Sequence, residues 1–179
     1  MVMATQNPIE QEGTYPLPEA QLDRFLMHVK IDYPDASAEQ SILRLARGEA
    51  LAHKDYDGSK LTEKHLIAAR GQVLQMHMSE AVEEYLVQLI IATREPGKYG
   101  DDLARWVEFG ASPRGTIALD RCARAYAWLE GRDYVSPDDV RAVAHDVLRH
   151  RILLSFEAEA SGLTTDTVIN ELLSRVPVA

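Results

Sequence analysis

The sequence predicts a mainly α-helical protein, in which a helical bundle follows a short segment with two strands. Two observations support this fold class. From Ser37 onward, apolar residues recur at helical spacing behind repeated N-cap signals. Before Tyr33, two short apolar stretches, residues 2–5 and 25–31, are typical of strands. We therefore divide the chain into residues 1–33 and a helical domain over residues 34–179.

The first segment has three expected elements. Residues 2–5 form a short buried strand, and residues 9–18 form a loop because they contain Gly13, Pro16 and Pro18. A short helix begins at Pro18, since proline suits the first helical position. The second strand covers residues 25–31 and ends at the Tyr-Pro-Asp sequence that follows.

Each later helix has an N-terminal signal. Ser37 and Gln40 fit a capping box, and Ser112 and Ser136 are each followed by a proline. The remaining caps are expected at Thr62, Ser79, and Thr164 or Thr165. The helix that begins at Ser112 should bury Ala118, Cys122, Ala125 and Leu129 and end near Gly131. The helix after Ser136 should bury Val140, Val143, Ala144, Val147 and Leu148.

Composition excludes several classes of protein. The chain has 179 residues, 46% of them hydrophobic, which indicates a globular protein with a core. A net charge of -9 disfavours nucleic acid as a partner, and no apolar run is long enough to span a membrane. The single cysteine, Cys122, cannot form an internal disulfide, and we expect a cytoplasmic protein.

Asn7 is the first candidate site residue. It directly follows the first expected strand and precedes Pro8. Ligands of open α/β sheets bind at the carboxyl ends of strands, where an amide can orient a water molecule against a phosphate. Asn-Pro also commonly begins a turn, so the dipeptide alone leaves both interpretations open.

Arg24 is the second candidate. It lies between the expected short helix and the second strand, flanked by Asp23 and Phe25. Its planar and permanently charged guanidinium suits phosphate oxygens. The alternatives are that Arg24 complements the dipole of its own helix or pairs with Asp23.

Arg114 is the third candidate, and it occupies the first turn of a helix. A cation there is unfavourable for the helix by about 0.3–1 kcal/mol. A helix N-terminus together with an arginine is nevertheless a good site for an anion, which indicates a phosphate ligand. Alternatively, Arg114 extends into solvent or pairs with Asp120 or Glu108.

Other patterns are structural in our interpretation. Gly110 and Gly115 have the glycine spacing of a phosphate loop, but Thr116 follows where that loop has lysine. The six histidines show no metal-ligand spacing, so no metal site is expected. Cys122 lies on an inward helical stripe and is expected to be a core residue. Arg121, Arg124, Arg149 and Arg151 form either one basic patch or separate solvated faces.

Three segments together resemble the MoxR family of AAA+ ATPases. They are Ala-Thr-Gln-Asn-Pro at residues 4–8, Leu-Pro-Glu-Ala-Gln-Leu-Asp-Arg-Phe at residues 17–25, and Gly-Ala-Ser-Pro-Arg-Gly-Thr at residues 110–116. The resemblance implies that Asn7 is sensor 1, Arg24 the arginine finger acting in trans, and Arg114 sensor 2, which contacts an ATP phosphate. It also implies that residues 1–33 are a remnant of the α/β ATPase core and residues 34–179 its helical lid domain.

The resemblance also implies an activity and partners. Family members are ATP-dependent chaperones that form rings, usually hexamers, use ATP and Mg²⁺, and often act on von Willebrand factor A domain proteins. These 179 residues contain no Gly-x-x-x-x-Gly-Lys-Ser/Thr loop and no apolar strand ending in Asp-Glu. We therefore expect this chain to require an N-terminal ATPase half and not to hydrolyse ATP by itself. The alternative is a stand-alone helical interaction or regulatory module.

Overall fold

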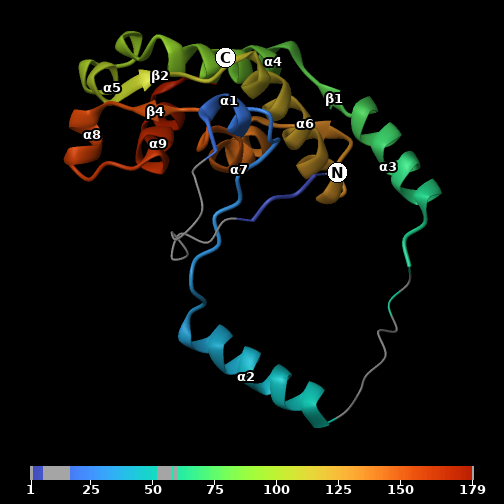
Figure 1. Cartoon of the computed structure of the whole chain (residues 1–179). Coiled ribbons are helices and arrows are strands. Elements are labelled where there is room, and N and C mark those ends of the chain that lie inside the picture. Colours follow the sequence, from blue (N-terminus) through green and yellow to red (C-terminus); the bar gives the residue numbers. More distant parts are fainter. Residues whose placement is uncertain (1, 6–16, 52–57, 59, 179) are drawn as a thin grey trace.

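The computed structural model describes residues 2–5, 17–51, 58 and 60–178, and most of them are helical (Figure 1). The helices are α1 (Glu19–Leu22), α2 (Ala36–Leu51), α3 (Glu63–Gln75), α4 (Glu80–Arg94), α5 (Asp101–Trp106), α6 (Pro113–Leu129), α7 (Pro137–Leu148), α8 (Phe156–Ala160) and α9 (Thr165–Arg175), with a 3-10 turn, η1, at Pro96–Lys98. The expected mainly helical fold class is confirmed. Within the described residues, no helix is long and apolar enough to cross a membrane.

The core lies between helices of the second half of the chain. α6 packs along α7 and against α4, and α9 contacts both α4 and α7. Tyr85, Leu119 and Val147 are fully buried where these helices meet. The five residues of α7 that were expected to be buried are all buried, as are Val168 and Leu172 of α9.

Most of the expected N-caps are confirmed. The side chains of Thr62, Ser79, Ser112 and Thr164 each accept a hydrogen bond from a backbone N–H in the first turn of the following helix. The expectation for α2 was wrong, because Asp35 and not Ser37 caps it. A carboxylate oxygen of Asp35 accepts from the backbone N–H of Ala38 at 2.8 Å and from the Ser37 hydroxyl at 2.7 Å.

The inward face of α6 is largely as expected. Ala118 and Cys122 are buried and Ala125 is half-buried. Leu129, the last residue of α6, was wrongly expected in the core and is 74% exposed. Gly131 ends the helix as expected, with a φ of 74° in the left-handed region that glycine favours.

Two small sheets connect the ends of these helices, and the sequence did not predict them. β1 (His77–Met78) pairs in parallel with β3 (Tyr134–Val135). β2 (Val107–Phe109) pairs antiparallel with β4 (Leu153–Leu154) through a bulge. Each strand has only two or three residues, which is too short for an alternating pattern to be recognised.

Neither of the two strands expected before Tyr33 is formed. Residues 2–5 are exposed and carry no strand pairing, and residues 25–31 are irregular. A strand requires a neighbour to satisfy its backbone hydrogen bonds, and no described segment lies alongside either stretch as a strand. The second stretch instead contacts the end of α7, where the backbone N–H of His28 donates to the carbonyl of Asp146 at 2.7 Å.

Helix α2 lies apart from the bundle (Figure 1). Over residues 36–49 every side chain is exposed except that of Ala38, which is half-buried. Three of its apolar side chains, Ile42, Leu43 and Leu45, are between 51% and 63% exposed. The helix is thus formed, but its apolar face has no partner among the described residues.

Candidate functional site

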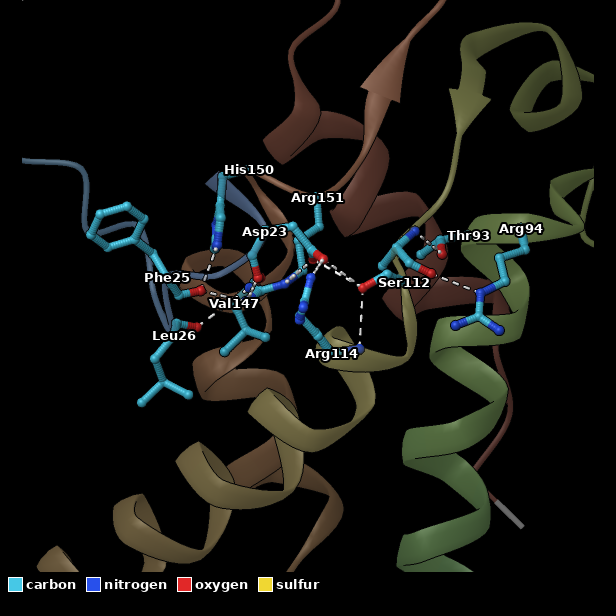
Figure 2. A network of polar contacts seen from close by, with 11 residues as sticks. Asp23, Phe25, Leu26, Thr93, Arg94, Ser112, Arg114, Val147, His150 and Arg151 are labelled. Carbon is cyan, nitrogen blue, oxygen red and sulfur yellow. Dashed lines mark hydrogen bonds and ion pairs between the residues drawn. The ribbon is translucent and has the colours of Figure 1, made fainter. Parts of the chain in front are cut away.

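The carboxylate of Asp23 is the centre of a polar network that joins three parts of the chain (Figure 2). Asp23 lies directly after α1. Its oxygens accept from the Ser112 hydroxyl at 2.8 and 3.0 Å, from Arg114 Nη1 at 3.3 Å and from Arg151 Nε at 3.2 Å. The network therefore connects the loop after α1 to the start of α6 and to the segment after α7.

Asp23 remains ionised in this setting. Its side chain is 18% exposed, and burial by itself would raise its pKa. The hydrogen bonds from Ser112 and Arg114 and the positive charges of Arg151 and Arg114 outweigh that effect and hold the pKa below its usual value. Asp23 thus carries a full negative charge between two guanidinium groups at neutral pH.

Arg24 is exposed to solvent beside this network. Its backbone N–H donates to the carbonyl of Gln21 at 3.2 Å. Within the described part of the chain, no ion pair or hydrogen bond holds its guanidinium. The alternative pairing with Asp23 does not occur, because that carboxylate faces Arg114 and Arg151.

Arg114 lies in the first turn of α6. Ser112 caps this helix by accepting from the backbone N–H of Arg114 at 3.1 Å. The Arg114 side chain is 56% exposed and pairs with Asp23. The pairings with Glu108 or Asp120 that the sequence suggested do not occur, and Asp120 pairs with Arg124 at 2.7 Å.

Arg24 and Arg114 are linked through Asp23. Asp23 precedes Arg24 in the chain and is bonded to Arg114 in space. An anion that bound to Arg114 would meet its positive charge close to the N-terminus of α6. Asn7, the third candidate, lies outside the described residues.

A cavity of about 280 Å³ adjoins the network. Glu19, Asp23, Phe109, Ser112 and His150 are among its lining residues. His150 faces the loop carbonyl of Phe25, with its Nε2 atom 3.1 Å from that oxygen. Burial, together with the nearby charge of Arg151, lowers the pKa of His150 to about 4, so the imidazole is neutral at pH 7 and Nε2 donates this bond.

Glycine is required at position 110 for a structural reason. A Cβ atom at position 110 would lie 2.3 Å from the backbone oxygen of Thr93. The Thr93 hydroxyl accepts from the backbone N–H of Ala111 at 2.9 Å, and Arg94 Nε donates to the Ala111 carbonyl at 2.7 Å (Figure 2). Glycine therefore lets the chain pass close to α4 before α6 begins.

The remaining candidates have no catalytic arrangement. Cys122 is buried, and burial raises the pKa of its thiol to about 11, which makes it an unreactive core residue. Across the described ranges, no group of three or more His, Cys, Asp or Glu side chains is placed to hold a metal ion. The four arginines do not form one solvated patch, because Arg124, Arg149 and Arg151 are each engaged in ion pairs.

Sequence reasoning missed the two residues that organise the site. Asp23 was considered only as a partner for Arg24, and Arg151 only as a surface charge. Arg151 is 7% exposed and makes an ion pair with Asp23 across 128 positions of sequence. The available signal was the run Arg149-His150-Arg151 directly after an apolar helix, where a cation suits the helix C-terminus.

Two protein families match the chain. The AAA lid domain matches residues 103–172, and the ATPase family associated with various cellular activities (AAA) matches residues 1–27. The first match covers α6, α7 and most of α9, and the second contains both Asn7 and Arg24. Arg114 lies within the lid match, whose residues 103–172 are part of the segment 34–179 that was inferred as the lid.

Curated relatives and a solved structure agree with these matches. The chaperone MoxR1 of Mycobacterium tuberculosis is 43% identical over 98% of this chain and 46% of its own length. The protein MoxR of Paracoccus denitrificans is 37% identical over 99% of this chain and 55% of its own. A crystal structure of a protein described as an ATPase, from Cytophaga hutchinsonii, is 40% identical with a TM-score of 0.89, covering 97% of this chain and 52% of that one. The chain therefore spans about half the length of these relatives.

Proposed function

The chain is a homologue of the C-terminal part of MoxR-family AAA+ ATPases, and from this premise we propose that it supplies the sensing residues and the lid of a ring ATPase. In this proposal residues 1–33 belong to the α/β core and residues 34–179 form the lid domain. Arg24 acts as the finger on a neighbouring subunit's nucleotide, Arg114 as sensor 2, and Asn7 as sensor 1.

The single observation that carries the proposal is that Arg24 is exposed while the carboxylate of the adjacent Asp23 is paired with other arginines. Asp23 pairs with Arg114 and Arg151, so Arg24 keeps its charge available at the surface. A permanently charged planar fork at a subunit edge is suited to stabilise charge on a transferring phosphoryl group.

The position of Arg114 supports the second role. Its side chain is half exposed, so its pair with Asp23 is solvated and contributes little to stability. A phosphate would offer more charge and would lie near the positive end of the α6 dipole. Arg114 can therefore exchange Asp23 for a phosphate at low cost.

We propose ATP with Mg²⁺ as the cofactors of the complete protein. The fit rests on Arg24 and Arg114, which suit the phosphate groups by charge and exposure. When bound, ATP supplies the phosphoryl group that is transferred to water. The phosphate loop and the acidic residues that hold Mg²⁺ do not occur in these 179 residues, so this chain by itself should not hydrolyse ATP.

The proposed partners follow from the same premise. They are an ATPase half that carries the phosphate loop, neighbouring subunits of a ring, with six as the expected number, and client proteins that contain von Willebrand factor A domains. We propose that the complete protein is a cytoplasmic chaperone that remodels such clients.

A second candidate function is a stand-alone helical interaction module. The exposed apolar side chains of α2, among them Ile42 and Leu45, favour this alternative because they could contact another protein. The two candidates differ in what they require of Arg24. An interaction module has no use for a finger arginine, whereas a ring ATPase fails without one.

The test is to mix this chain with an N-terminal half that carries the phosphate loop and to measure ATP hydrolysis. We expect hydrolysis only in the mixture, and we expect Arg24→Ala to lower kcat by about 10³-fold or more. Arg105→Ala is the matched control, because Arg105 is also an exposed arginine and lies on α5. Appreciable hydrolysis by this chain alone, or full activity of Arg24→Ala, would refute the proposal.

A further inference from the structure

Arg151 is a buried cation whose hydrogen-bonding capacity is fully used. It lies between α7 and β4, and its side chain is 2% exposed. A guanidinium has five N–H donors, and Arg151 has five acceptors: the Asp23 carboxylate from Nε, the carbonyls of Leu26 and Val147 from Nη1, and those of Asp23 and Phe25 from Nη2. Four of these acceptors belong to residues 23–26.

These four acceptors surround Arg24 in the chain. The carbonyl of Asp23 precedes it, and the carbonyls of Phe25 and Leu26 follow it. Arg151 makes no hydrogen bond to the Arg24 side chain, but it binds the backbone on both sides of that residue. The direction in which Arg24 leaves the surface is therefore set by a residue 127 positions later in the chain.

The same end of α7 makes further bonds to this loop. Arg149 Nη1 donates to the carbonyl of His28 at 2.6 Å, and His150 donates to the carbonyl of Phe25. Arg149 and His150 are less buried than Arg151, and each contacts a single carbonyl of the loop. Arg151 alone among the three reaches both the backbone and the side chain of Asp23 (Figure 2).

We propose that Arg151 is a positioning residue that holds the loop bearing Arg24 against the helical domain in the orientation needed by the neighbouring subunit. This inference rests on the proposed function of Arg24. Because Asp23 also binds Arg114, the clamp joins the finger loop and the start of α6 into one unit. Lysine cannot replace Arg151, since its three donors cannot satisfy five acceptors.

Hydrogen exchange of the chain tests the clamp itself. Arg151→Met replaces the arginine with an unbranched apolar side chain and removes all five donors. The amides of Arg24, Phe25 and His28 should then exchange faster, on the order of tenfold to a hundredfold, while those of α6 and α9 are unchanged. Arg151→Lys should give a smaller acceleration, and the exposed control Arg105→Met none. Unchanged exchange at residues 24–28 in Arg151→Met would overturn the proposal.

If Arg151→Met accelerates exchange throughout the core, Asp23→Asn provides the second variant. It preserves the size of the side chain and removes the charge that Arg151 and Arg114 share. The proposal then requires local acceleration at residues 24–28 in Asp23→Asn, and its absence there would overturn the proposal.

The kinetic test uses the ATPase reconstituted from this chain and the half with the phosphate loop. Arg151→Met should lower kcat on the order of tenfold to a hundredfold with little change in KM, because it displaces a group that acts in the transition state. The double variant with Arg24→Ala should be no slower than Arg24→Ala alone. Full activity of Arg24→Ala would refute the proposed finger. If Arg24→Ala loses activity but Arg151→Met keeps its full kcat, only the clamp is refuted. The same holds if the losses in kcat of the two single variants add up in the double variant.

Discussion

Helices α2 and α6 are similar in length and in amphipathic pattern, yet they have opposite environments. α6 buries Leu119, Ala123 and Ala127 completely, whereas the described side chains of α2 are almost all exposed. The difference is that α6 contacts α4 and α7, while α2 lies apart from the bundle (Figure 1). An amphipathic pattern thus predicts a helix and its apolar face, but it does not predict which surface covers that face.

The comparison also separates two sources of stability. The helices of the bundle are stabilised by tertiary packing of apolar side chains, which is the main contribution for most helices in proteins. Among the described residues, α2 has only local sources of stability, chiefly the cap from Asp35 and the intrinsic preference of its residues for the helix. We therefore expect the two regions to respond differently to the same kinds of substitution.

The largest expected difference is for removal of an apolar side chain. Leu119→Ala should lower the free energy of unfolding by about 2–5 kcal/mol, because Leu119 is fully buried in α6 and its removal leaves a cavity. Leu45→Ala should change it by no more than about 0.5 kcal/mol, because Leu45 is 63% exposed in α2. Urea denaturation of both variants gives the measurement. Equal losses would mean that α2 is packed against the rest of the chain.

A pH effect is expected where the N-terminal loop meets α7. The folded-state pKa of His150 is lowered to about 4 from an ordinary value of 6.5, chiefly by burial. The unfolded chain binds the proton more readily, so the stability is fully present above pH 6.5 and falls as the pH decreases toward 4. The loss should amount to at most about 3 kcal/mol.

The control for this effect is His150→Gln, which removes the titrating group. Its unfolding free energy should vary less than that of the unchanged chain between pH 6.5 and 5, above the range in which carboxylates begin to titrate. Identical pH profiles of the two chains in that interval would show that His150 does not cause the dependence. NMR titration of the imidazole gives an independent reading of its pKa.

The smallest expected effect compares glycines within the two helices. A Cβ atom at Gly48 of α2 meets no atom within 4 Å, so Gly48→Ala should stabilise that helix by about 0.5–1 kcal/mol. A Cβ atom at Gly115 of α6 would lie 3.1 Å from the Cβ of Ala111 and from Cδ1 of Ile90. Because Ala111 is buried and short, it cannot move aside, and Gly115→Ala should lower stability by about 1 kcal/mol.

Hydrogen exchange distinguishes the two glycine variants. Gly48→Ala should slow exchange within α2 and leave α6 unchanged, while Gly115→Ala should lower the urea midpoint of the core. A stabilised core in Gly115→Ala would contradict the packing at the start of α6.

Much of the fold could be predicted from sequence because its signals are local. Caps such as Ser79 and Thr164, and the buried faces of α7 and α9, depend on residues within one helix. Strands of two residues carry no such signal, so β1 to β4 could not be predicted. The strand expected at residues 25–31 failed because this stretch contacts α7 and the core, where Met27 packs, and not a neighbouring strand.

The site was predicted only in part. The residue types at Arg24 and Arg114 could be recognised from short motifs, because each lies next to a helix end. The role of Asp23 could not be predicted, since its partners Ser112, Arg114 and Arg151 are 89 to 128 positions away. The burial of Arg151 is a tertiary property, and in the sequence it is one arginine among several.

The most direct test of the account is complementation between two inactive variants in one ring. One subunit carries Arg24→Ala in this chain, and the other carries a phosphate loop whose lysine is changed to alanine. If Arg24 acts on the nucleotide of a neighbour, mixed rings contain some sites with both an intact loop and an intact finger. The account predicts that mixing the two variants restores ATP hydrolysis, which neither variant has alone. It would be contradicted if mixed rings form but stay inactive at every mixing ratio.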